Sequence, residues 1–268
     1  MFPGPSFQPG VQSSLFGLNA ISGTDIWAVG DLISNGMGIC PLQESPCTEF
    51  EHWDGTAWTS TTAVIGGIMN AVSADATNDV WAVGFSGLST TTPGSQPLVT
   101  HYDGTAWQQV ASPMIGSAQS ASTLNGVVAL APNNVWATGF SIPVPHGHML
   151  TLIEHYDGST WSVVPSPNVG TESNVLLGIV ADSPTDIWAL GYYFTDAFGH
   201  RKTLLLHWDG GAWSVAPSPS PKPTSFLSDF LSGGVVTAPG NVWIVGSKDT
   251  AAPNKPITGA LVLHTTGG

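Results

Sequence analysis

The sequence predicts an all-β fold: a five-bladed β-propeller with four antiparallel strands in each blade. Three observations lead to this prediction. A Trp-centred hexapeptide recurs five times, a His-x-Asp-Gly turn follows each of the first four copies, and a small residue precedes every copy at a constant spacing. Units of ~40–50 residues with four strands each are typical of propellers.

The small residue marks the first strand of each unit, and the hexapeptide marks the second. The first copy of the hexapeptide is Asp25-Ile26-Trp27-Ala28-Val29-Gly30, and successive tryptophans lie 52 to 55 residues apart. The five tryptophans are Trp27, Trp81, Trp136, Trp188 and Trp243. The small residues ten positions before them are Gly17, Ala71, Gly126, Gly178 and Gly233.

The third and fourth strands of a unit flank the His-x-Asp-Gly segment, as in His52-Trp53-Asp54-Gly55. Asp-Gly between two apolar runs is a strong signal for a tight hairpin. We expect the fourth strand to begin at the next tryptophan, which is Trp58 in the first unit. Pro-Ser-Pro then ends it in the third and fourth units, because proline cannot donate a hydrogen bond to a sheet.

The units predict one domain, residues 1–268, with blades near 11–64, 65–113, 114–167, 168–219 and 220–268. The last unit ends at Gly268 without a fourth strand. If the N-terminus is placed after it, Phe2 falls at the position of the missing tryptophan. We therefore expect residues 1–7 to complete the last blade and the ring to close, which removes exposed sheet edges. The alternative is a fragment of a longer array.

The Asp-Gly-x-x-Trp turns and the closely similar units resemble kelch-like proteins and repetitive lectin propellers, including the five-bladed tachylectin group. The resemblance covers the whole chain but concerns architecture alone. The double-glycine signature of kelch repeats is absent, and no sugar-binding residue of the lectins can be matched. The resemblance implies a propeller that binds carbohydrate.

Composition excludes several classes of function. Charged residues make up only 9% of the chain, and its formal net charge is -13. Such a surface repels nucleic acids and anionic membranes. No apolar run reaches the ~18 residues of a membrane-spanning helix. Cys40 and Cys47 predict a disulfide and an extracellular or cell-surface location, with two free thiols in a cytosolic loop as the alternative.

Residues that recur in every unit are expected to have structural roles. All eleven tryptophans and five of the eight histidines lie in repeat positions. We expect the tryptophans to fill the space between sheets and the histidines to brace the hairpins. Function then falls to the connections between second and third strands, which vary in length and sequence. These are Asp31–Glu49, Ser86–Gln96, Ser141–Met149, Phe194–Lys202 and Lys248–Gly259.

Eight residues in or beside these connections form the predicted ligand-binding set. Aromatic rings directly after the second strand would stack on sugar rings, although they would equally cap the sheets. Two histidines one residue apart, with a third in the next unit, leave open a metal site; we predict no metal, no cofactor and no catalytic residue. The set is Asp31, Phe85, Phe140, Tyr192, Tyr193, His146, His148 and His200.

The sequence thus predicts a secreted, non-catalytic binding module, with carbohydrate as the leading ligand. The expected partners are glycans or another extracellular protein, with homo-assembly also open and no nucleic acid or membrane insertion. One alternative is a structural or adhesive protein that assembles with itself. Another is a glycosidase acting on polysaccharide through unpaired carboxylates such as Asp31, Glu172 and Asp229, because glycoside hydrolysis needs two positioned acids.

Overall fold

The computed structural model describes residues 11–34, 46–61, 65–87, 94–117, 120–143, 147–219, 229–252 and 255–266. Its strands form five antiparallel sheets, called the first to fifth blade in chain order. The first blade contains β1 (Val11–Ser22), β2 (Asp25–Ser34), β3 (Cys47–Trp53) and β4 (Trp58–Thr61). The second contains β5 (Ile68–Ala76), β6 (Asp79–Ser86), β7 (Gln96–Tyr102) and β8 (Trp107–Val110). The third contains β9 (Ala121–Ala131), β10 (Asn134–Ile142), β11 (Leu150–Tyr156) and β12 (Trp161–Val163). The fourth contains β13 (Asn174–Ser183), β14 (Asp186–Phe194), β15 (Arg201–Trp208) and β16 (Trp213–Val215). The fifth contains β17 (Phe230–Ala238), β18 (Asn241–Ala252) and β19 (Lys255–Thr266).

The all-β, four-stranded pattern predicted from the repeat is confirmed for the first four blades. Each strand pairs with the one before it, and each fourth strand begins at the predicted tryptophan. The fifth blade differs in two ways. Its described part has three strands, because residues 2–6 lie outside the described residues. The predicted loop Lys248–Gly259 is also wrong, since Lys248 pairs with Gly259 and the hairpin continues to Ala252 and Lys255.

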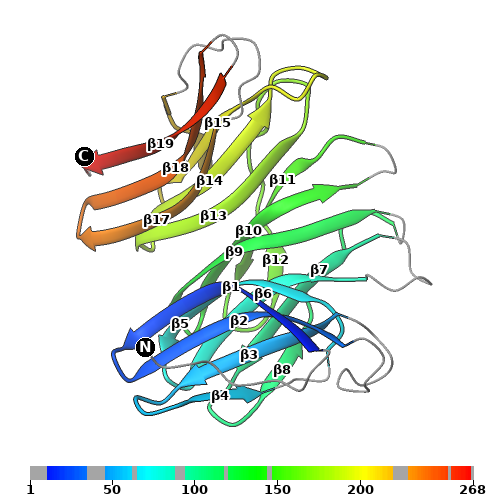
Figure 1. Cartoon of the computed structure of the whole chain (residues 1–268), viewed down its shortest axis with the longest axis vertical. Coiled ribbons are helices and arrows are strands. Elements are labelled where there is room, and N and C mark those ends of the chain that lie inside the picture. The colour runs from blue at the N-terminus through cyan, green and yellow to red at the C-terminus, as the bar shows by residue number, and fades with distance from the viewer. Residues whose placement is uncertain are drawn as a thin grey trace.

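The blades follow one another around an arc that stays open between the first and fifth blades (Figure 1). Each of the first four blades packs against the next, whereas β1 and β17 do not pack together. The predicted closed ring is therefore wrong for the described residues. The repeat determines which residues of neighbouring blades pack together. The angle of rotation from one blade to the next determines how many blades close a ring, and no single residue encodes that angle.

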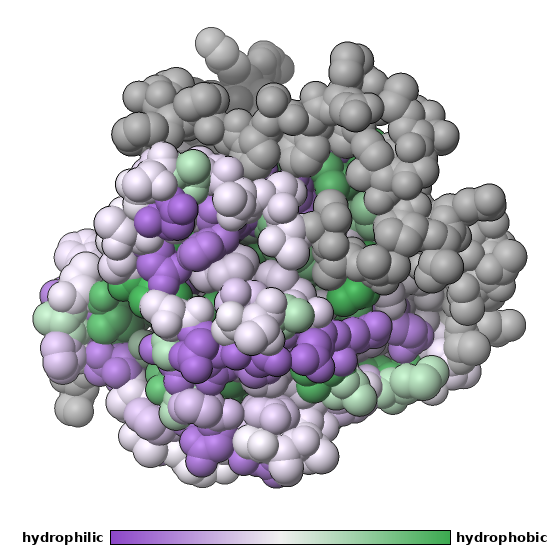
Figure 2. Space-filling model, turned by 90° about the horizontal axis from the view of Figure 1, so that it is seen from below, coloured by the Kyte–Doolittle hydropathy of each residue, from purple (hydrophilic) through white to green (hydrophobic). Residues whose placement is uncertain are grey.

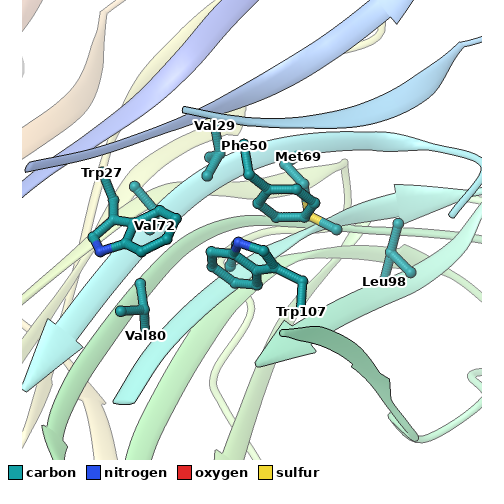
Figure 3. Close-up of a cluster of buried hydrophobic side chains, with 9 residues drawn as sticks. Trp27, Val29, Phe50, Met69, Val72, Val80, Leu98 and Trp107 are labelled. Carbon is teal, nitrogen blue, oxygen red and sulfur yellow. The ribbon is translucent and has the colours of Figure 1, made fainter. Parts of the chain in front are cut away.

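Each interface between blades is built from the same positions. Between the first and second blades, Trp27, Val29 and Phe50 meet an apolar set from the second blade (Figure 3). That set is Met69, Val72, Val80, Leu98 and Trp107. Each blade therefore has a forward face, which carries its second-strand tryptophan, and a rear face, which receives the tryptophan of the preceding blade. The predicted role of the tryptophans between sheets is confirmed.

The repeated histidines brace their blades differently from the prediction. His101 Nε2 lies 2.6 Å from Asp79 Oδ1 at the start of the second strand, and its ring stacks on Trp81 at 4.2 Å. Trp81 Nε1 donates to the same Asp79 oxygen at 2.8 Å. The hairpin is held instead by the aspartate of its own turn, since Asp103 Oδ1 accepts from the amides of Thr105 and Ala106.

Close approach between blades requires a small residue on the first strand at the inner interfaces. A Cβ on Gly126 would lie 2.9 Å from the Cα of Gly178, the equivalent residue of the next blade. The glycine that ends the hexapeptide faces its own neighbouring strand, where a Cβ on Gly139 would lie 1.8 Å from the carbonyl oxygen of Thr123. Both spacings explain why these positions carry only small residues.

The surface has few strongly polar regions. Figure 2 shows one face on which near-neutral residues cover much of the coloured area and strongly hydrophilic ones form narrow bands. This pattern fits a chain in which only 9% of residues are charged. Within the described ranges, no helix is long and apolar enough to cross a membrane.

Candidate functional site

The predicted aromatic residues occupy one repeated position on three different blades. Phe85, Phe140 and Tyr192 follow the hexapeptide glycine on β6, β10 and β14, and each is half-buried. The first blade has Asp31 at this position, where it is buried and the burial raises the pKa of its carboxyl. The four residues therefore lie along the arc, one to a blade.

The predicted histidines are held by separate acidic partners. His148 is exposed, and its Nδ1 lies 3.5 Å from Glu172 Oε2. His200 Nδ1 lies 2.5 Å from Asp196 Oδ2 within one connection. His146 lies outside the described residues. Among those described, no group of three His, Cys, Asp or Glu side chains is placed to hold a metal ion.

An arginine surrounded by aromatic rings lies between the fourth and fifth blades. The guanidinium carbon of Arg201 is 4.8 Å from the ring centre of Tyr192, 5.9 Å from that of Phe194 and 6.0 Å from that of Phe230. Tyr192 and Phe194 meet edge to face at 5.5 Å. Arg201 pairs with Phe194 across β14 and β15, and Tyr192 lies two residues before Phe194, so the three side chains share the forward face. We call Tyr192, Phe194, Arg201 and Phe230 the arginine cluster.

The positive charge of the arginine cluster has no ion-pair partner among the residues that the structure describes. Arg201 is the chain's only arginine. No carboxylate of the described residues forms an ion pair with it, although ion pairs form elsewhere on the molecule. Cations over aromatic rings are stabilised by the ring quadrupole and keep their N–H groups available to an anion. The cluster is thus suited to a ligand with both an anionic group and an apolar face.

The turn beside the arginine cluster holds a phenyl ring in solvent. Asp196 Oδ1 accepts from the amide of Phe198 at 3.0 Å, and the amide of Thr195 donates to the carbonyl of His200 at 2.9 Å. The hydrogen bond from His200 holds the pKa of Asp196 below its usual value. Phe198 is 90% exposed on this ordered turn. An exposed ring on a fixed backbone suits stacking against a sugar.

Tyr193 lies on the other side of the fourth blade. Adjacent residues of a strand point to opposite faces, so Tyr193 and Lys202, which pair across β14 and β15, face the third blade. They line a pocket of about 340 Å³ with Thr203 and Ser218. The prediction that Tyr192 and Tyr193 act as one set is therefore not matched by their placement.

Positive charge is confined to this end of the arc. All five lysines and arginines lie in residues 201–268 with three aspartates, a formal charge of +2. Residues 1–200 carry fifteen aspartates and glutamates and no lysine or arginine, a formal charge of -15. Any electrostatic attraction of an anionic ligand therefore comes from the part of the chain after residue 200, which begins with Arg201 and Lys202 of the fourth blade.

Three glutamates are buried on the third strands of the first and third blades. Burial raises the pKa of Glu49 on β3 to about 7, even though Ser13 donates a hydrogen bond to it. Burial also raises the pKa of Glu154 on β11 to about 7, where Ser112 Oγ donates at 2.7 Å. Glu51, two residues after Glu49, is buried with its pKa raised. Glu49 and Glu51 share one face of β3 and form an acid pair.

The acids predicted for the glycosidase alternative lie on different blades. Asp31 is on β2, Glu172 precedes β13, and Asp229 precedes β17. Asp229 is buried, and its amide donates to the carbonyl of Arg201 at 3.4 Å. The disulfide between Cys40 and Cys47 stays a prediction, because Cys40 lies outside the described residues.

Comparison with known proteins relates the fold to enzymes and a lectin. No protein-family model matches the sequence, and a sequence search among curated proteins finds no match. A polysaccharide lyase, an ulvan lyase bound to -[GlcA(1-4)Rha3S]-, is 13% identical at a TM-score of 0.54, over 100% of this chain and 70% of the other. The α-L-arabinofuranosidase Arb93A from Fusarium graminearum is 11% identical at a TM-score of 0.50, over 98% and 95%. A six-bladed fungal lectin from Aleuria aurantia is 14% identical at a TM-score of 0.49, over 96% and 80%. At these identities the first two share the fold with this chain, and no functional residue is transferred.

Sequence reasoning found the right connection but missed most of the arginine cluster. Tyr192 and His200 belong to the predicted set, whereas Phe194, Phe198, Arg201 and Phe230 do not. The sequence signal for this cluster is the chain's only arginine, Arg201, which directly follows the predicted His200. Phe230 was out of reach, because only the packing of the fifth blade on the fourth brings it to Arg201.

Proposed function

We propose that this chain binds an acidic carbohydrate, without chemical turnover, at the arginine cluster between the fourth and fifth blades. The observation that carries the proposal is the Arg201 guanidinium, which lies over Tyr192 within 6.0 Å of two further rings and has no carboxylate partner among the described residues. A carboxylate or sulfate of a sugar accepts from the guanidinium as a charge-assisted pair. We further propose that the protein acts outside the cell, on the sequence grounds given above.

The second part of the proposed site is the exposed ring of Phe198. Aromatic rings contribute apolar contact area to sugars, whose ring C–H groups form one face, while polar groups set orientation. The Asp196–His200 turn holds this ring beside β15, on which Arg201 begins the strand. The ulvan lyase of similar fold is bound to -[GlcA(1-4)Rha3S]-, which makes this acidic repeat a suitable first ligand to test.

Calorimetric titration with an ulvan oligosaccharide and a neutral arabinan oligosaccharide tests the proposal. We expect binding of the acidic ligand and a loss of about tenfold or more in affinity for Arg201→Ala, since a charge-assisted pair contributes about 1.5–3 kcal/mol. Lys202→Ala is the matched control, because Lys202 is the next residue along β15 and faces the opposite side of the blade. Affinity should also fall as salt rises.

Two results would overturn this assignment. Failure of both oligosaccharides to bind would remove carbohydrate as the ligand class. Equal affinity of Arg201→Ala and the unmodified chain, with a loss for Lys202→Ala, would move the site to the pocket beside Tyr193.

A second candidate function is hydrolysis or elimination at the acid pair of the first blade. Glu49 has a pKa of about 7, which suits a general acid, and Glu51 lies on the same face. Both side chains are buried in the described structure, so a substrate would first need access. Release of reducing ends or unsaturated sugars from ulvan or arabinan, lost in Glu49→Gln, would establish this function in place of simple binding.

A further inference from the structure

A small pocket lies at the edge of the fourth blade, on the side that faces the third blade (Figure 1). Its volume is about 340 Å³, and it shares no residue with the arginine cluster. Its walls come from β14, β15, the chain from Val215 to Ser218 and the connection that precedes β13. Pockets that hold small molecules begin at about 300 Å³, so this one is large enough for a ligand of one or two rings.

Most of the pocket wall is apolar. Tyr193, Leu204 and Val215 contribute side chains from the sheet face that meets the third blade, and Val169 adds a wall from the connection between the two blades. Leu204 belongs to the core at this interface, and Tyr193 and Val169 pack against that core. A wall held by the core is formed before a ligand arrives, which lowers the entropy lost on binding.

The pocket has one charged group. Lys202 pairs with Tyr193 across β14 and β15, so the two side chains start as close neighbours on the same face. Within the described ranges, no carboxylate forms an ion pair with Lys202. A lysine ammonium is a compact point charge that binds an anionic group without requiring a particular plane. The pocket therefore favours a ligand with a negative charge.

The two hydroxyl side chains of the pocket already have partners. Thr203 Oγ1 lies 2.8 Å from Ser218 Oγ, and each hydroxyl also lies within 3.3 Å of a backbone carbonyl oxygen. A sugar ring brings several hydroxyl groups, and each one left without a partner on binding costs free energy. A ligand with a single anionic group and an apolar body avoids this cost, so the pocket suits it better than a sugar.

The residues that give the pocket its chemistry depart from the repeat. Tyr193 and Lys202 occupy a pair of positions that carries no aromatic ring and no charge on the second or third blade. The corresponding pairs are Ser86 with Gln96 and Ser141 with Leu150. The fold of a blade therefore does not require a tyrosine and a lysine here. Residues placed on a uniform scaffold beyond what its packing needs are candidates for binding.

We propose that this pocket binds a small aromatic carboxylate, with the carboxylate on the Lys202 ammonium and the ring against Tyr193. The ion pair is a charge-assisted hydrogen bond, and two aromatic rings attract each other beyond the area that they bury. Val169 and Val215 supply the remaining apolar contact. This proposal is independent of the proposed function, because it uses different residues and the opposite face of the blade.

Calorimetry and saturation-transfer NMR with phenylacetate and 2-phenylethanol test the proposal, since the two probes share a ring but only one is charged. We expect phenylacetate to bind with a dissociation constant of about 0.1–1 mM, about tenfold or more tighter than the alcohol. Lys202→Met keeps an unbranched side chain without the charge and should abolish the difference between the probes. Arg201→Ala is the control, because Arg201 faces the other side of the blade, and it should bind phenylacetate unchanged.

A second variant tests the pocket itself rather than its charge. Val215→Phe fills the space beside Tyr193 and should abolish binding of both probes. Val163→Phe is the matched control, since Val163 lies two residues after the fourth-strand tryptophan of the third blade, as Val215 does in the fourth. The two valines are 46% and 50% exposed, so a larger ring is accommodated at either position without crowding the core. Circular dichroism checks that each variant keeps its fold.

Four results would overturn the proposal. These are no binding of phenylacetate, equal affinity for the two probes, a Lys202→Met variant that still prefers phenylacetate, and a Val215→Phe variant that binds as the unmodified chain does. Titration of the same variants with the ulvan oligosaccharide keeps the two proposals separate. Arg201→Ala should lose only the oligosaccharide and Lys202→Met only phenylacetate, so either proposal can fail while the other holds.

Discussion

The second and fifth blades have the same repeat positions but opposite environments. Trp81 is buried against Tyr156 and Trp161 of the third blade, whereas Trp243 stacks on His264 of its own blade and is 39% exposed. The difference shows that a blade supplies half of each interface and that its neighbour supplies the burial. Stability in such an array is therefore approximately a sum of blade and nearest-neighbour contributions.

The tryptophans should show the largest difference in the loss of unfolding free energy between an inner blade and the fifth blade. Trp81→Ala should lower the free energy of unfolding by about 3–5 kcal/mol, because it empties a buried site between two blades. Trp243→Ala should cost well under half as much in the monomer, since no following blade covers its ring. Urea unfolding at low protein concentration measures both. Equal losses would mean that Trp243 is buried in solution.

Leu124 and Leu15 occupy the same repeat position on the third and first blades. Their replacement by alanine should show a smaller difference in unfolding free energy than the tryptophans do. Leu124→Ala is expected to cost about 2–5 kcal/mol, whereas Leu15→Ala should cost under ~1 kcal/mol because its side chain is already half in water. Thermal or urea unfolding of the two variants gives the comparison. The reverse order would contradict the exposed position of Leu15 on β1.

Buried glutamate makes stability depend on pH. Because burial raises the pKa of Glu154 to about 7 from its ordinary value of 4.5, the folded chain binds a proton that the unfolded chain releases. Stability from this group is full below pH ~4.5 and is lost as pH rises through ~7, by up to about 3 kcal/mol. Glu154→Gln keeps an acceptor for Ser112 and should flatten the curve of unfolding free energy against pH. An unchanged slope would show that Glu154 ionises normally.

The smallest expected effect on stability is at Asp79, whose carboxylate accepts hydrogen bonds from His101 and Trp81. The third and fifth blades carry Asn134 and Asn241 at this position, and both accept from the equivalent histidine. Asp79→Asn should therefore change stability by less than ~1 kcal/mol, whereas Asp79→Ala should cost about 1–3 kcal/mol because two donors lose their acceptor. Urea unfolding separates the two variants, and equal losses would show that the charge of Asp79 is what matters.

Much of the fold was predictable because each blade repeats its local signals. Trp58, Trp107 and Asp103 mark strand starts and turns through residue type alone, and the structure places them as expected. Closure was not predictable, since it depends on the small rotation between blades that accumulates around the arc. The hairpin between Lys248 and Gly259 was also missed, because its sequence lacks the alternation of a half-buried strand.

The candidate site was predictable only in part. Loop variability indicated the connection between β14 and β15, and Tyr192 was identified as the ring after the repeat glycine. The contact of Arg201 with Phe230 joins residues of two blades, so no local pattern contains it. The acid pair was likewise hidden, because Glu49 becomes unusual only when compared with the leucines at the same position of other blades.

Acrylamide quenching of tryptophan emission in Trp243→Phe and Trp81→Phe tests most directly whether the neighbouring blade is what buries the second-strand tryptophan. The account predicts a smaller quenchable fraction in Trp243→Phe, because Trp243 is 39% exposed, and an unchanged fraction in Trp81→Phe, because Trp81 is buried. An unchanged quenchable fraction in Trp243→Phe would contradict it.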